Sequence, residues 1–262
     1  MKILALIFAA AVLSTPCFAD NRQFADGEQV VLQPDLAYVL VRTFDEKGKG
    51  LKATAIFTPV LVRTLSKDEL QQANDLAQKD PDRWMNKIEP NVVGPYADRP
   101  YMQKDVEEFM VFAVKPGVYA LGGVAIGNTD WTKGGVVVAS LCMGTVKFEA
   151  KPGMITDLGA VVIAHDDHPT DIPELAKIVS GKDRGFGSYL LVVAVRPVTS
   201  AMETPEGLKA LPIVTADYSA VDAFPNFLGG RLSRLAPLPG VLDYDKDGHA
   251  IDLHAGSKAP QP

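Results

Sequence analysis

Alternation of apolar and polar residues dominates the chain and predicts mainly β-strands. The stretch 106–164 contains four such runs, "EEFMVFAV", "VYALGGVAI", "GGVVVASLCMGTVKFEA" and "MITDLGAVVIA". They are separated by Lys-Pro-Gly, Gly-Asn-Thr-Asp and a second Lys-Pro-Gly. Short strands with turn signals at this spacing are typical of an antiparallel sandwich or barrel. We therefore predict a mainly β fold with an antiparallel, sandwich-like core over about 106–198, which includes a further buried strand at 188–198.

Two more β-rich segments precede this core. They are 37–44, "AYVLVRTF", and 51–65, "LKATAIFTPVLVRTL". The polar, glycine-bearing "DEKGKG" between them predicts a β-hairpin. Their phrases "VLVRTF" and "VLVRTL" form a near-repeat, but two copies do not predict a solenoid or propeller, which needs a sustained period.

Two short helices are expected beside the strands. Ser66-Lys-Asp-Glu69 is a capping box, in which the serine oxygen and the glutamate carboxylate bind free amides of the first helical turn. That helix should end near Asp80-Pro81. Asp171-Ile-Pro-Glu174 predicts the start of a second capped helix, which should end at Ser180-Gly181.

One phrase occurs twice, as "FAVKPGVYALGGV" from Phe112 and as "FEAKPGMITDLGAV" from Phe148. Proline fixes φ for the second position of a turn and glycine accepts the positive φ of the third, so Lys-Pro-Gly predicts a type II turn. Type II turns splay the strands of a tight two-residue hairpin. The phrase therefore predicts either a longer hairpin loop or a reversal that carries the chain between sheets, and in both cases its role is architectural.

The strand before the second copy has one charged face and one apolar face. The charged positions are Lys147, Glu149 and Lys151, and the apolar positions are Cys142, Val146, Phe148 and Ala150. Strand alternation then places the charges in water and the thiol in the core. We expect Cys142 to be buried and inert, as free cysteines commonly are.

"PGVYAL" (116–121), after an apolar strand, resembles the PG-x-Y-x-L turn of carboxypeptidase-regulatory-like, prealbumin-type β-sandwich domains. The wider pattern, continuing to "CMGTVKFEAKPGMITDLGAV", looks like uncharacterised secreted bacterial proteins that carry such a module. The resemblance covers about 107–163, and the second copy departs from it with Ile155-Thr156-Asp157. It implies an accessory or binding module rather than an enzyme, and it identifies no catalytic residue.

The first nineteen residues have the pattern of a secretory signal peptide. Lys2 precedes the apolar run 3–13, and "STPCFA" supplies a small-residue cleavage site after Ala19. The run is too short to span a bilayer as a helix. Cys17 raises lipidation as an alternative, but a lipoprotein signal has a small residue where this chain has Pro16, so ordinary cleavage is favoured. We expect a periplasmic or secreted protein.

Composition and charge limit the classes of partner that the protein could bind. The formal net charge is −6 and no basic cluster occurs, which argues against nucleic acid and anionic membrane surfaces as partners. Cleavage would leave Cys142 as the one cysteine, so an ordinary hydrophobic core rather than an internal disulfide must stabilise the fold. We predict one β-rich domain over 20–235 and a proline-rich, polar tail over 236–262, with a possible hairpin and a disordered end.

The strongest candidate site is "HDDHPTD" (165–171). In a tight turn residues i and i+3 lie within about 7 Å, so His165 and His168 could share a zinc or copper ion with Asp167 as a third ligand. The alternative is a solvated loop between a strand and a capped helix, because Asp, His and Pro are ordinary turn residues.

"DYDKDGHAIDLH" (243–254) resembles the start of a calcium loop, but His254 stands where the loop needs a bidentate glutamate. A hairpin of "VLDYD" and "HAIDL" around Lys-Asp-Gly is the favoured interpretation. His249 and His254 could in principle join the other two histidines around one metal, although no pattern in the sequence brings them together.

No pattern joins a nucleophile, a base and an orienting group. We therefore predict a binding or envelope-associated accessory module without a resident cofactor, with an envelope protein or small ligand as partner. Loops near Trp131 or 237–239 are candidate contact regions. The alternatives are a metal carrier or metal-dependent hydrolase built on His165, Asp167 and His168, and a structural envelope component.

Overall fold

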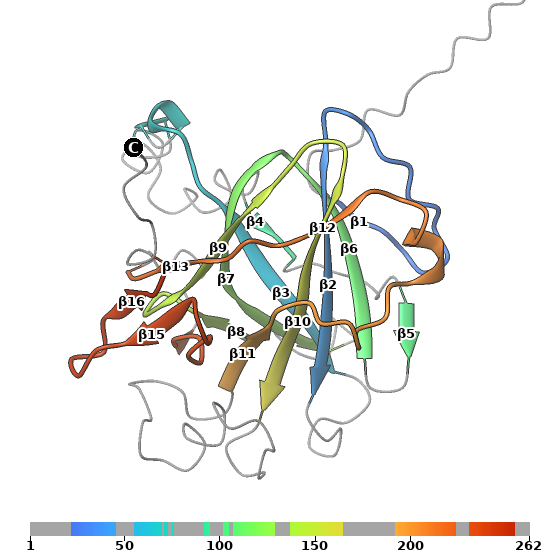
Figure 1. The fold of residues 1–262 in the computed structure, drawn as a ribbon. Coiled ribbons are helices and arrows are strands. Elements are labelled where there is room, and N and C mark those ends of the chain that lie inside the picture. Colours follow the sequence, from blue (N-terminus) through green and yellow to red (C-terminus); the bar gives the residue numbers. More distant parts are fainter. Residues whose placement is uncertain are drawn as a thin grey trace, which may run out of the picture.

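A computed structural model describes residues 22–45, 55–69, 71–72, 75, 92–94, 102–104, 107–128, 137–164, 192–223 and 231–254. As predicted, this part of the chain is mainly β. Two large sheets pack against each other with a small hairpin beside them (Figure 1). Among the described residues, no helix is long and apolar enough to cross a membrane.

The first sheet is ordered β1-β6-β2-β10-β11, and two short strands pair beside this path. Its strands are β1 (Arg22–Gln23), β6 (Glu107–Val114), β2 (Ala37–Asp45), β10 (Ile155–Ala164), β11 (Val192–Arg196), β5 (Met102–Lys104) on β6, and β12 (Ile213–Thr215) on β10.

The second sheet is ordered β13-β9-β7-β3-β4, with β8 on β7 and β14 on β8. Its strands are β13 (Ser219–Val221), β9 (Thr145–Ala150), β7 (Gly117–Asn128), β3 (Ala55–Arg63), β4 (Val92–Val93), β8 (Val137–Ser140) and β14 (Arg231–Leu232). The small hairpin consists of β15 (Leu242–Tyr244) and β16 (Ala250–Asp252). Most pairings are antiparallel, as predicted, but β10 runs parallel to β2 and β12, and β14 runs parallel to β8.

The predicted hairpin between 37–44 and 51–65 is wrong. β2 lies in the first sheet between β6 and β10, whereas β3 lies in the second sheet beside β7 and β4. The reason is visible in β2, where neighbouring residues are apolar and buried on both faces of the sheet. A strand of that kind belongs in the interior of a covered sheet, and its partners are chosen by burial rather than by a nearby turn signal.

Both Lys-Pro-Gly phrases carry the chain between the sheets, which confirms one of the two predicted alternatives. The first joins β6 to β7 and the second joins β9 to β10. Gly117 pairs with Ala150, so the two crossings lie side by side at the same end of β7 and β9. Gly153 has φ +71°, close to the value of a type II turn, whereas Gly117 has φ +150°, which is not the type II value, and is the first residue of β7.

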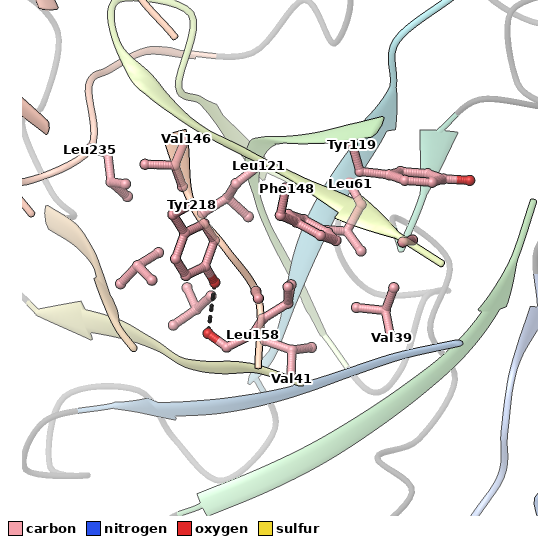
Figure 2. Close-up of a cluster of buried hydrophobic side chains, with 14 of the residues drawn as sticks. Val39, Val41, Leu61, Tyr119, Leu121, Val146, Phe148, Leu158, Tyr218 and Leu235 are labelled. Atoms are coloured by element: carbon pink, nitrogen blue, oxygen red, sulfur yellow. Dashed lines mark hydrogen bonds between the residues drawn. The ribbon is translucent and has the colours of Figure 1, made fainter. Parts of the chain in front are cut away.

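The main core lies between the sheets. Tyr119, Phe148 and Tyr218 form a row of rings across it (Figure 2), with centroids 6.2 Å apart at each step. The predicted alternation in β9 is confirmed, since Val146 and Phe148 are buried and the intervening Lys147 is exposed.

The outer face of the first sheet is buried as well. Tyr38, Leu40, Phe109 and Val111 project there and pack with residues from both ends of the chain. Those residues are Phe24, Val30, Leu32 and Leu36 on the N-terminal side and Leu208, Leu211 and Ile213 on the C-terminal side.

The core also extends beyond the predicted 106–198 into the region after β14. Leu235, Leu238 and Leu242 are buried in the cluster between the sheets. The Ser233 amide donates to the Ser140 carbonyl of the second sheet at 2.8 Å, and the Ala236 amide donates to the Val193 carbonyl of the first sheet at 2.9 Å. This segment therefore connects the edges of the two sheets.

Candidate functional site

The predicted zinc or copper site at His165, Asp167 and His168 lies outside the described residues and stays a prediction. The signal peptide at 1–19, the second helix and the Trp131 loop also lie outside them. Within the described part of the chain, no three or more His, Cys, Asp or Glu residues are grouped closely enough to hold a metal ion.

The predicted hairpin within "DYDKDGHAIDLH" is confirmed by the antiparallel pairing of β15 with β16. Asp245 Oδ1 accepts hydrogen bonds from the amides of Asp247 at 2.8 Å and His249 at 2.9 Å. Gly248, at φ +87°, completes a turn of the three-residue hairpin type. Hydrogen bonds donated by the backbone amides of His249 and Asp247 lower the pKa of the Asp245 carboxyl. Both oxygens of the Asp245 carboxylate thus contact the loop itself, since Oδ2 lies 3.3 Å from His249 Nδ1.

The prediction that Cys142 lies in the core is wrong. The thiol-bearing residue is half-buried in a turn ahead of β9, which begins only at Thr145. Strand alternation therefore does not extend back to this residue, and Gly144 at φ +147° separates it from the strand. Leu141, one residue earlier, takes the core position.

A buried ion pair lies within the first sheet. Arg42 of β2 is completely buried, and its Nη1 and Nη2 donate to the two carboxylate oxygens of Asp157 in β10 at 2.6 and 3.0 Å. The Arg42 Nε and Nη2 also donate to the carbonyl of Glu203 at 3.1 and 2.7 Å. One guanidinium therefore holds together two strands and a segment that covers the outer face of the sheet.

A β-bulge shapes the backbone around this pair. The register between β10 and β2 shifts between Asp157 and Ala160. Gly159 has φ +74°, its amide donates to Asp157 Oδ1 at 2.8 Å, and its carbonyl accepts from Arg42 at 3.2 Å. The hydroxyl of Tyr218 donates to the Leu158 carbonyl at 2.7 Å, as the dashed line in Figure 2 marks. Arg42 and Asp157 thus bond to each other and to the backbone of two separate segments, so this network is a structural anchor.

The sequence contains a signal for this anchor that residue-type motifs do not capture. Arg42 in "VLVRTF" and Asp157 in "MITDLGAVV" are charged residues inside apolar strands. Buried charges are normally paired, so two opposite charges in two buried strands predict each other as partners.

A pocket of about 300 Å³ lies between residues 22–36 and the outer face of the first sheet. Tyr38 of β2 and Ala113 of β6 come from the sheet, and the rest of the lining comes from the N-terminal segment. These other residues are Arg22, Phe24, Glu28, Gln29, Val31, Gln33 and Leu36.

Hydrogen bonds hold the wall of this pocket in place. The Tyr38 hydroxyl accepts from the Gln33 amide at 2.9 Å and donates to the Val31 carbonyl at 3.0 Å. Glu28 accepts from the Ala25 amide at 3.0 Å, and its other oxygen lies 2.7 Å from Arg22 Nη2. The N-terminal segment has no strong sequence periodicity, so sequence reasoning missed this site; only the packing of that segment on the sheet forms it.

In the predicted contact region at 237–239, Leu238 is buried in the core, Pro237 is half-buried and Pro239 is exposed, and its role as a contact stays a prediction. Comparison with protein-family models, with curated proteins and with solved structures found no match to this chain. The resemblance to carboxypeptidase-regulatory-like domains therefore stays a prediction.

Proposed function

We propose that the protein is an extracytoplasmic β-sandwich binding module whose ligand occupies the pocket beneath residues 22–36. One observation carries the proposal: the N-terminal segment is fastened to the sheet on both sides of the pocket, yet a volume of about 300 Å³ stays open between them. That volume is at the lower end of the range of small-ligand sites, which are mostly apolar with a few polar groups.

The chemistry of the lining favours binding over catalysis. Glu28 and Tyr38 are the lining residues whose side chains could act as an acid or a base, and both are engaged in bonds that shape the pocket wall. A catalytic site would need a nucleophile or base oriented toward the open volume. A small ligand, rather than a reacting substrate, fits this arrangement.

The signal-peptide pattern over residues 1–19 supports an extracytoplasmic location. β1 begins at Arg22, just after the predicted cleavage point at Ala19. Cleavage there would remove none of the residues that line the pocket. The acidic net charge of −6 agrees with a small-molecule or protein partner rather than nucleic acid.

Native mass spectrometry of the protein purified from the periplasm without chelators tests this proposal. We expect a chain that starts at Asp20 and carries a small organic adduct. The Val31→Asp variant should lose that adduct, because it places a charge in the lining of the pocket. Since Val31 is 63% exposed, we expect the variant to stay folded.

Val214→Asp is the matched control, since Val214 is also exposed, at 37%, and does not line the pocket. An adduct that both variants retain would contradict the pocket as the binding site. A zinc or copper adduct that His165→Ala removes would instead favour a metal carrier or metal-dependent hydrolase. A chain that retains residues 1–19 would contradict export with cleavage.

A further inference from the structure

We infer that the pocket beneath residues 22–36 selects an uncharged ligand, a compact apolar group that carries an amide, of the kind an aliphatic residue within a peptide presents. This inference rests on the proposed function, since it names the ligand class of the same site.

The floor of the pocket is apolar. Phe24, Tyr38 and Ala113 are buried, and Phe24 and Tyr38 place their ring centroids 6.0 Å apart. Leu36 and Val31 add aliphatic surface on the side of the N-terminal segment. Because Phe24, Tyr38 and Ala113 are at most 3% exposed, the apolar surface that a ligand could cover comes mainly from Val31 and Leu36. Covering it stabilises a complex by roughly 25 cal/mol per Å², which favours an aliphatic group.

The charges at the pocket neutralise each other. Arg22 Nη2 lies 2.7 Å from Glu28 Oε1, and the Arg22 guanidinium lies 4.2 Å from the centre of the Phe24 ring. These side chains are the cation and the anion of the pocket lining. A charged ligand would therefore meet no net opposite charge, yet it would lose hydration on entering an apolar site.

Neutral hydrogen-bonding groups remain at the pocket. Gln29 and Gln33 both line it, and a glutamine side chain offers an acceptor oxygen and two donor hydrogens without charge. A peptide amide has the complementary donor and acceptor. A single aliphatic residue with its flanking amides also suits a volume of about 300 Å³, the lower limit for small-ligand pockets.

Three leucine derivatives test this selectivity, because they share one side chain and differ in charge. They are N-acetyl-leucine N-methylamide, which is neutral, N-acetyl-leucine, which is anionic, and leucine amide, which is cationic at low pH. We expect the neutral compound to bind about tenfold or more tightly than either charged one, because burying an unpaired charge is costly. Titration of the mature protein followed by NMR shifts of Ala113 and Val31 measures the three affinities.

Glu28→Gln sharpens the test, since it leaves a side-chain oxygen for the Ala25 amide and removes the charge that neutralises Arg22. In this variant the anionic derivative should gain affinity relative to the neutral one, by about tenfold. The variant's thermal unfolding should stay close to that of the parent, since the pair is partly exposed to solvent.

The outcomes separate the two levels of the argument. Binding at the pocket with a preference for a charged derivative, or with no change of preference in Glu28→Gln, overturns the inferred ligand class and leaves the binding module intact. If no derivative shifts these resonances and the purified protein carries no adduct, the proposed function itself fails.

Discussion

Arg42 and Arg63 occupy the same place in the two phrases "VLVRTF" and "VLVRTL", and the fold gives them opposite environments. Arg42 is completely buried and bonds to Asp157, whereas the Arg63 side chain is 15% exposed and pairs with Glu69, which is 40% exposed. The first pair is isolated from water and the second is screened by it. The same local sequence therefore forms an anchor in one sheet and a surface contact in the other.

The strands that contain these two phrases also pair differently with the strands that follow the Lys-Pro-Gly stretches. β2, with "VLVRTF", runs parallel to the strand that follows the second stretch, whereas β3, with "VLVRTL", runs antiparallel to the strand that follows the first. The repetition in sequence is therefore not a repetition of one structural unit. The two stretches share their residue types, but they differ in the φ of their glycine and in strand pairing.

Arg63 links the first Lys-Pro-Gly crossing to the start of the helix. Its Cδ lies 3.5 Å from the position that a side chain on Gly117 would take. Its partner Glu69 accepts from the Ser66 amide at 2.9 Å, and Ser66 Oγ accepts from the Glu69 amide at 3.2 Å. These reciprocal bonds confirm the predicted capping box.

The largest effect is expected from Asp157→Ala. The substitution leaves the Arg42 charge buried without its carboxylate partner, and breaking a buried pair in this way costs about 3–5 kcal/mol of unfolding free energy. Urea unfolding measures it. The double variant Arg42→Met/Asp157→Leu removes both charges and should recover most of the loss, since apolar replacements of buried pairs are often tolerated. A loss below about 1 kcal/mol in Asp157→Ala would show that the pair is not isolated from water.

A smaller loss of stability is expected from alanine substitutions at two glycines that have nearly equal φ angles. Gly159 and Gly153 have φ +74° and +71°, so alanine at either position is strained by about 1–2 kcal/mol. At Gly159 the added Cβ would also lie 2.1 Å from the Arg196 carbonyl oxygen, whereas at Gly153 the nearest atom is Pro34 Cα at 3.8 Å. Gly159→Ala should therefore lower the melting temperature clearly more than Gly153→Ala. Equal shifts in the two variants would contradict the close approach at the bulge.

The smallest effect concerns the partly exposed pair of Arg63 and Glu69. Hydrogen bonds, first from Arg63 and then from the Ser66 amide, lower the pKa of Glu69 from 4.5 to about 2. Because the folded pKa is the lower one, the ionised carboxylate stabilises the fold above pH 4.5, and this contribution is lost as the pH falls toward 2. Solvent screening keeps it below about 1 kcal/mol.

Comparison of urea unfolding for the parent chain and Glu69→Gln, from pH 5 down to pH 2, detects this contribution. The difference between the two chains should shrink as the pH falls. A difference that stays constant over this range would mean that the Glu69 charge does not contribute, and that the capping bonds alone stabilise the start of the helix.

Sequence reasoning succeeded where neighbours along the chain decide the outcome. The capping box at 66–69, the hairpin around Lys-Asp-Gly and the alternation in β9 each depend on a few consecutive residues. It failed for the pairing of β2 with β3 and for Cys142, because partner choice and the exact start of a strand depend on distant residues. The pocket was missed for the same reason, since its floor and its wall come from segments that are far apart in sequence.

The sequence by itself determined that this protein is mainly β and that its Lys-Pro-Gly stretches turn the chain, because alternation and turn chemistry are local properties of the backbone. Only the tertiary structure decided which strands pair, which arginine is buried and where a cavity remains. Those outcomes depend on how much apolar surface all strands can bury together, and on the requirement that each buried charge finds a partner. Arg42 and Asp157 meet because the fold brings β2 and β10 side by side, 115 residues apart along the chain.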